Sequence, residues 1–154
     1  MRFINGGMLK KLFSKIIARA AHIHLKSGAE AAFDGWVNAL CSANPERVVA
    51  FYAEDAILNA TLSPTPMATQ AERFVYFEKI TRMPGIKVRI ESQHLRMFGD
   101  MLAVVSGLYA FEFMRDGEQV KIPARYSFVF QRNNNGDWLV IDHHSSCLPE
   151  SVIN

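Results

Sequence analysis

The sequence predicts an α+β domain in which helices cover one face of an antiparallel β-sheet. Helical periodicity dominates the first half of the 154 residues, whereas the second half contains long segments of alternating polarity. Helices followed by hairpin-connected strands are typical of the α+β class. The chain is long enough for one domain with a substantial core, and 49% of its residues are apolar.

The first 27 residues form a basic leader. They hold six of the 17 Lys and Arg side chains and no acidic side chain, although the whole chain has a formal net charge of only +2. From Met8 to Ala20, apolar residues recur at helical spacing and basic residues occupy the other side, which predicts an amphipathic helix. We expect two regions: this leader, 1–27, and a single domain, 28–154.

The role of the leader stays open between two interpretations. It packs on the domain or on a partner subunit, or it serves as an organellar or membrane-surface targeting helix. Lys15 and Arg19 interrupt every apolar stretch, which disfavours a secretory signal. We therefore expect a cytoplasmic protein, with organellar or membrane-surface targeting as the alternative. The slightly acidic remainder of the chain argues against a nucleic-acid partner.

Two helices open the domain. Residues 29–42 carry one apolar stripe that includes Phe33 and Leu40. Asn44-Pro45-Glu46 then supplies an N-cap, a first-position proline and an acidic first turn, which predicts a second helix to about Tyr52.

A short strand and a third helix follow. Residues 56–62 alternate in polarity and predict a strand, and the prolines at 64 and 66 predict a loop after it. Thr69-Gln70-Ala71-Glu72 fits a capping box, which opens a third helix that runs to about Arg82.

Four long β-like segments make up the remainder. Gly99-Asp100, Asp116-Gly117 and Asn135-Gly136 separate them, and such dipeptides between alternating segments predict hairpins. The expected strands are 86–98, 101–114, 119–132 and 137–147.

Alternation assigns the side chains of these strands to two faces. The face expected to lie beneath the helices is mostly aromatic, and His143 and Ser145 are its polar members. The opposite face holds Leu108, Ala110, Glu112, Arg125, Ser127, Val129, Val140, Asp142, His144 and Ser146. The inward set is Tyr109, Phe111, Phe113, Tyr126, Phe128, Phe130, Leu139, Ile141, His143 and Ser145.

The run from Asp142 to Ser146 is the chemically richest stretch. His143 and His144 point to opposite faces of a strand, so they do not chelate one ion together, and no metal site is predicted. Arg125 is either a cation that orients an anion or half of an ion pair with Glu112 or Asp142.

The C-terminal segments 124–130 and 136–146, followed by Pro149, resemble a known group. They are similar to the calcium/calmodulin-dependent protein kinase II association-domain branch of the nuclear transport factor 2-like superfamily. Within it, the ending His-His-Ser-Ser resembles iota-class carbonic anhydrases, although this chain has Asp142 where that ending has a third histidine. Weaker similarity extends the match to about residues 29–150, through 36–40, 58–63, Tyr76-Phe77 and 107–109.

The resemblance implies a cone-shaped, cystatin-like fold with a strongly curved sheet, a homodimer and a pocket between sheet and helices. For the iota class it implies reversible hydration of CO2 without a metal or other cofactor, so that CO2 and bicarbonate, or another small anion, are the expected ligands.

A metal-free site must polarise water and stabilise a bicarbonate-like transition state with fixed hydrogen-bond donors. We hypothesise that the hydroxyls of Thr61, Tyr76 and Ser145 hold water and bicarbonate. His143 would accept or relay the proton, and Tyr109 would be an additional donor. The candidate substrate-binding side chains are Trp36, Arg125, Phe128 and His144.

Two other functions remain open. A non-catalytic association module would use the pocket for a small carboxylate or for nothing, and Arg125 would then matter more than His143. An isomerase or cyclase of the same fold needs a carboxylate base, so Glu112 or Asp142 would have to point into the pocket.

Overall fold

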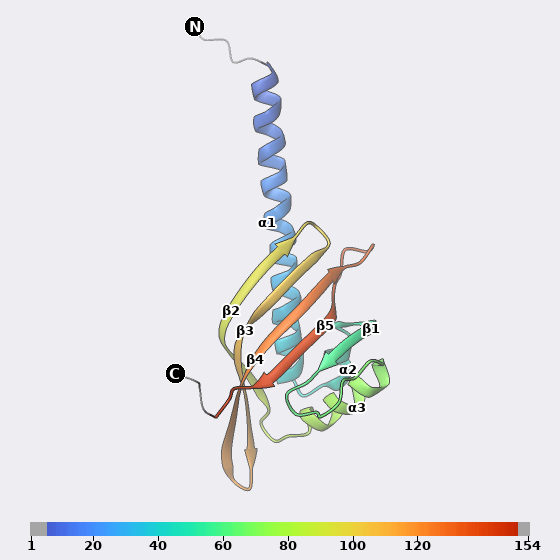
Figure 1. Ribbon diagram of the computed structural model, residues 1–154, viewed down its shortest axis with the longest axis vertical. Coiled ribbons are helices and arrows are strands. Elements are labelled where there is room, and N and C mark those ends of the chain that lie inside the picture. The colour runs from blue at the N-terminus through green and yellow to red at the C-terminus, as the bar shows by residue number, and fades with distance from the viewer. Residues whose placement is uncertain (1–5, 151–154) are drawn as a thin grey trace.

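The computed structural model describes residues 6–150, and within them three helices lie against one curved sheet (Figure 1). This arrangement confirms the predicted α+β class. The elements are α1 (Gly6–Cys41), α2 (Pro45–Val49), β1 (Tyr52–Asn59), α3 (Gln70–Thr81), β2 (Lys87–Phe98), β3 (Leu102–Arg115), β4 (Glu118–Arg132) and β5 (Trp138–Cys147).

The five strands are ordered β1-β5-β4-β3-β2 across the sheet. Strands β2 to β5 form the predicted antiparallel meander. One pairing departs from that pattern, because β1 runs parallel to β5 and places Leu58 opposite His143. Parallel strands need a long connection between them. Here α3 and the strands β2, β3 and β4 lie between β1 and β5 in the chain.

The β3–β4 hairpin shows why the turn dipeptides predicted the meander. Asp116 and Gly117 both have positive φ, 53° and 82°. A two-residue turn with this backbone matches the twist of the strands it connects. The predicted hairpin at Asp116-Gly117 is therefore confirmed.

Helix α1 replaces the two helices that the sequence predicts for the leader and for residues 29–42. The chain continues as one helix through Gly28, where an added Cβ would lie 2.9 Å from Nε1 of Trp138. An isolated glycine lowers helix propensity by about 1 kcal/mol without ending the helix. Within residues 6–150, no helix has both the length and the apolar character needed to cross a membrane.

The second and third helices begin where their caps predict. The Asn44 side chain accepts a hydrogen bond from the Arg47 amide, and Thr69 and Glu72 form the complete capping box. The predicted end of the second helix, at about Tyr52, was wrong. Helix α2 ends at Val49, and Tyr52 is the first residue of β1. The amide of Val140 donates to the carbonyl of Phe51, so pairing with β5 extends the chain there.

A bulge in β5 changes which side chains face inward. Val129 lies opposite Asp142 and Phe130 lies opposite Val140, which leaves Ile141 as the extra residue. Val140 is therefore buried together with His143, whereas Ile141 is half-buried on the other side. The inward assignment of Leu139 and Ile141 and the outward assignment of Val140 were wrong, because strict alternation does not continue through a bulge.

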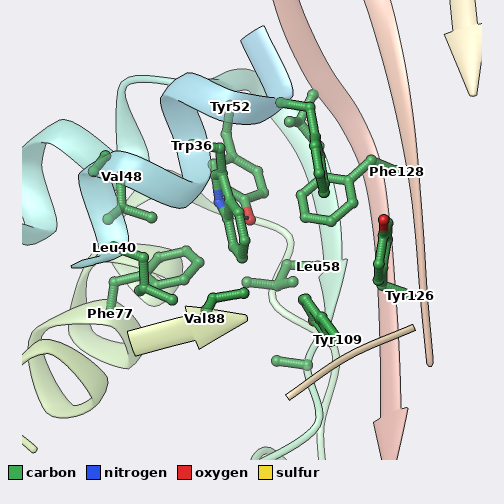
Figure 2. Close-up of a cluster of buried hydrophobic side chains, with 14 of the residues drawn as sticks. Trp36, Leu40, Val48, Tyr52, Leu58, Phe77, Val88, Tyr109, Tyr126 and Phe128 are labelled. Carbon is green, nitrogen blue, oxygen red and sulfur yellow. Dashed lines mark hydrogen bonds between the residues drawn. The ribbon is translucent and has the colours of Figure 1, made fainter. Parts of the chain in front are cut away.

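The core lies between α1 and the concave side of the sheet and is rich in aromatic rings. Figure 2 shows Trp36 of α1 next to Tyr52 of β1, with Phe128 of β4 beside them. Phe33 stacks on Tyr126 and meets the edge of Phe128. The aromatic residues of β3 and β4 are buried as predicted.

Candidate functional site

His143 lies in the middle of this aromatic core, with 3% of its surface exposed. Its ring stacks on Phe128 with centroids 3.7 Å apart, and the edge of Trp36 meets it at 5.4 Å. The Tyr52 hydroxyl lies 2.8 Å from Nδ1 of His143, and Nε1 of Trp36 donates to the Tyr52 oxygen at 3.1 Å. Helix α1, strand β1 and strand β5 each contribute one member of this chain.

The hydrogen bonds around Tyr52 favour one tautomer of His143. The indole of Trp36 only donates, so the Tyr52 oxygen accepts from it. The Tyr52 proton then needs an acceptor, and Nδ1 of His143 provides it. A proton on Nδ1 would instead leave the buried Tyr52 proton without an acceptor, so we assign the imidazole proton to Nε2. This Nε2–H group is buried and has no hydrogen-bond partner.

Such an unpaired buried donor is uncommon. Most buried polar groups in proteins have a partner, and a lone one costs about 1–3 kcal/mol. Unsatisfied groups of this kind occur where a ligand or a water molecule completes the site. Within residues 6–150, the buried side-chain groups without a partner are Nε2 of His143 and Nε of Arg73.

A cluster of hydroxyl groups lies two residues further along the same face of β5. The Tyr109 hydroxyl donates to Oγ of Ser145 at 2.6 Å, and Oγ1 of Thr61 forms a hydrogen bond with the same oxygen. Ser145 and Tyr109 are buried, and Thr61 is half-buried in the turn that follows β1. The structure thus brings together three of the five predicted catalytic residues in one bonded group, with His143 beside it.

These groups are neutral at physiological pH. Burial, together with the neighbouring His144, lowers the pKa of His143 to about 3. Burial raises the pKa of Tyr109 and of Tyr76 well above their ordinary value. The site is consequently a set of uncharged hydrogen-bond donors in a low-dielectric surrounding, where such dipoles act more strongly than in water.

Tyr76, the fifth predicted catalytic residue, lies on α3 and is half-buried. Its ring meets the edge of Phe77 at 5.1 Å between centroids. It lines a cleft of about 550 Å³ with Leu62, Met67 and Val75. Charge on its phenol would raise the pKa of Tyr109, so the two rings interact electrostatically.

A second cleft leads to the hydroxyl cluster from outside. Its volume is about 330 Å³, and Thr61 and Ser145 line it together with Asn59 and His144. The hydroxyl groups therefore lie at the boundary between the buried imidazole and this opening.

Arg125 and His144 do not join the buried cluster. Both are exposed on the other face of the sheet, because they alternate with Tyr126 and His143. They line a shallow depression of about 170 Å³ there, although His144 also borders the second cleft. Of the predicted substrate-binding residues, Trp36 and Phe128 contact the His143 ring.

The two candidate carboxylates also lie away from the cluster. Glu112 is buried but forms an ion pair with Arg89, and Asp142 is exposed. Arg125 was predicted to form an ion pair with Glu112 or Asp142 as one alternative, but Glu112 pairs with Arg89 instead. Within residues 6–150, no three His, Cys, Asp or Glu side chains are placed to hold a metal ion together.

The structure adds two residues that the sequence did not indicate. Tyr52 was assigned to a helix, which hid its place opposite β5. Arg73 of α3 is fully buried, donates to the carbonyls of Ala53, Glu54 and Ala56, and has its guanidinium carbon 5.7 Å from the centre of the Tyr52 ring. No sequence pattern separates this arginine from an exposed helical one.

The fold and the site define the class of protein. A curved sheet with α1 across its concave side and α2 and α3 at one end is the cone-shaped, cystatin-like architecture of nuclear transport factor 2-like proteins, as predicted (Figure 1). The chain belongs to the calcium/calmodulin dependent protein kinase II association domain family, whose sequence profile matches residues 28–149.

Several solved structures are similar to the chain. A Xanthomonas campestris protein named for the same association domain is 36% identical, with a TM-score of 0.74 over 79% of this chain and 86% of its own. A cystatin-like protein from Novosphingobium aromaticivorans is 12% identical and has a TM-score of 0.78, covering 90% and 91% of the two chains.

A ketosteroid isomerase-like protein from Erwinia carotovora atroseptica is 17% identical, with a TM-score of 0.72 over 80% of this chain and 96% of its own. At such low identities, the cystatin-like protein and the ketosteroid isomerase-like protein show the fold alone. No curated protein is significantly similar to the chain.

Proposed function

We propose that the buried cluster of hydroxyl and imidazole donors binds bicarbonate and hydrates CO2 without a metal ion. The observation that carries this proposal is the unpaired Nε2–H of His143, beside the bonded hydroxyls of Tyr109, Ser145 and Thr61. Bicarbonate offers three oxygen acceptors in one plane, and it matches a site made of neutral donors.

The chemistry needs the charge of the product to be stabilised as it forms. Water adds to the carbon of CO2, one C–O bond forms, one C=O bond becomes a C–O⁻ bond, and a proton leaves. Fixed donors in a dry site stabilise the developing oxyanion without having to reorganise. His143 and Ser145 would supply such donors, and the ring of Phe128 and the indole of Trp36 would exclude bulk water.

His143 acts here as a donor rather than as the proton acceptor that the sequence suggested. Its Nδ1 is occupied by the Tyr52 proton, and its pKa of about 3 keeps the ring neutral. The released proton instead passes along the hydroxyls of Ser145 and Thr61 to the second cleft. His144 borders that cleft and is exposed, so the cleft opens to solvent beside it.

The resemblance of the His-His-Ser-Ser ending to iota-class carbonic anhydrases supports the same proposal. The chain keeps the two histidines and two serines, and its Asp142 points away from the buried cluster. Asp142, which stands where the family ending has a third histidine, therefore lies outside the proposed site.

A second candidate function is a non-catalytic association module. The family match favours it, since that family is named for an association domain. In this case the chain forms a homodimer, and the donor cluster binds a small carboxylate without turnover. An isomerase is less well supported, because Glu112 and Asp142 both lie away from the cluster.

The test is a stopped-flow measurement of CO2 hydration by the full chain after exhaustive chelation. We expect a rate above that of buffer, and we expect Ser145→Ala to lower kcat on the order of 100-fold, as loss of one oxyanion donor does in other enzymes. Ser127→Ala is the matched control, because Ser127 is exposed on the other face of the sheet and does not line the second cleft, and its rate should equal that of the wild type.

Three results would reject the anhydrase proposal. One is a rate equal to buffer, another is a rate that chelation removes and zinc restores, and the third is equal loss in both serine variants. Binding of bicarbonate or acetate at the cluster without any turnover would instead favour the association module.

A further inference from the structure

The N-terminal half of α1, residues 6–26, extends beyond the sheet as an arm (Figure 1). The described side chains from Gly7 to His24 are all exposed, and burial becomes complete only at Ala29. Because α1 is one helix, the arm continues directly into the helix that carries Trp36. At 1.5 Å per residue its length is about 30 Å.

One side of the arm is an exposed apolar stripe. Its large side chains recur at the spacings of one helical face: Leu12 and Ile16 are four residues apart, as are Phe13 and Ile17, and Ile23 follows Ile16 by seven. Each of them has between 54% and 66% of its surface exposed. A contiguous apolar surface of this kind marks an interaction site in a folded protein. The stripe consists of Leu12, Phe13, Ile16, Ile17 and Ile23.

The remaining surface of the arm is basic. Five lysine or arginine side chains border the stripe or lie opposite it, and the first acidic residue of the chain is Glu30. Against a second copy of the arm, these charges would repel one another. Against an anionic surface, every one of them is attractive. The basic side chains are Lys10, Lys11, Lys15, Arg19 and Lys26.

We propose that the arm binds the surface of a membrane that contains anionic lipid. The apolar stripe enters the boundary between headgroups and acyl chains, and the basic side chains contact lipid phosphates and carboxylates. An amphipathic helix with large apolar residues on one face and lysine or arginine on the other binds a bilayer in this way. The arm thereby holds the domain close to the membrane.

The experiment is co-sedimentation of the full chain with phosphatidylcholine vesicles prepared with and without phosphatidylserine. We expect binding to the vesicles that contain phosphatidylserine, and we expect it to weaken as salt is added. Lys11→Gln, Lys15→Gln and Arg19→Gln together should reduce the affinity on the order of 100-fold, because each charge contributes about fivefold.

The stripe is tested with two neutral double variants. Leu12→Gln with Ile16→Gln removes two side chains of the stripe, and we expect affinity to fall at least about tenfold. Ser14→Gln with Ala18→Gln introduces the same residues at the same spacing on the opposite face, and affinity should change less than about twofold. Thermal melts of both variants should match the wild type, because the arm lies outside the core.

Two outcomes would overturn the proposal. The first is that the wild-type chain does not bind vesicles that contain phosphatidylserine, including the case in which the stripe instead joins two copies in solution. The second is that both double variants lose affinity equally, since the stripe would then have no particular role.

Discussion

Removing the Tyr52 hydroxyl is the sharpest perturbation of the buried site. In Tyr52→Phe, the Trp36 indole loses its acceptor and Nδ1 of His143 loses its donor, while the ring of residue 52 still fills its place. Each buried group left unpaired costs about 1–3 kcal/mol, so we expect a loss of about 2–6 kcal/mol in the free energy of unfolding.

The same variant should weaken the proposed function without abolishing it. His143 is no longer restrained to one tautomer, so its Nε2–H is presented to the ligand for only part of the time. A neutral hydrogen bond contributes about 0.5–1.5 kcal/mol, which corresponds to a two- to tenfold lower rate of CO2 hydration. Urea unfolding and stopped-flow hydration measure the two effects.

Tyr126→Phe is the matched control for this variant. Tyr126 is also a core tyrosine, but its hydroxyl donates to the carbonyl of Ser92, away from His143. We expect this variant to lose about 0.5–1.5 kcal/mol of stability. Its rate of CO2 hydration should equal that of the wild type. Two results would refute the assignment of the His143 proton to Nε2. One is a wild-type ¹⁵N spectrum with the proton on Nδ1, and the other is equal changes of stability and hydration rate in both tyrosine variants.

Three further predictions concern stability. Because the pKa of His143 is lowered to about 3, the unfolded chain binds a proton below about pH 6.5 that the folded chain does not. The free energy of unfolding should therefore decrease below about pH 6.5, by up to about 1.4 kcal/mol per pH unit. In urea titrations at several pH values, His143→Phe should flatten this dependence. Gly107→Ala should lower the melting temperature strongly, since its Cβ would lie 2.0 Å from the Ser92 carbonyl oxygen, with a cost of about 3 kcal/mol or more. Thr69→Ala removes the cap of α3 and should cost about 1 kcal/mol by denaturation, with the hydration rate unchanged.

Much of the fold follows from local signals in the sequence. The capping box at Thr69 and the turn at Asp116-Gly117 depend on a few neighbouring residues, and both form as predicted. The parallel pairing of β1 with β5 joins residues more than 80 positions apart, and no local pattern encodes it. The bulge at Ile141 also depends on the partner strand, so alternation alone misassigned Leu139.

The candidate site was predictable to a similar extent. Periodicity placed Tyr109, His143 and Ser145 on one face; all three are buried there, and Tyr109 is hydrogen-bonded to Ser145. Tyr52 was missed because the N-cap at Asn44 suggested a helix long enough to include it. Its role depends on β1 lying next to β5, which is a tertiary property.

The most direct measurement is an NMR titration of the ¹⁵N-labelled chain with bicarbonate after chelation, following the side-chain resonances of His143. We predict that the unliganded protein has the proton on Nε2, and that bicarbonate shifts this resonance as the group gains an acceptor. Chloride at equal ionic strength should leave it unchanged, and Ser145→Ala should weaken the response. A proton on Nδ1, or an Nε2 resonance that bicarbonate does not move, would contradict the account.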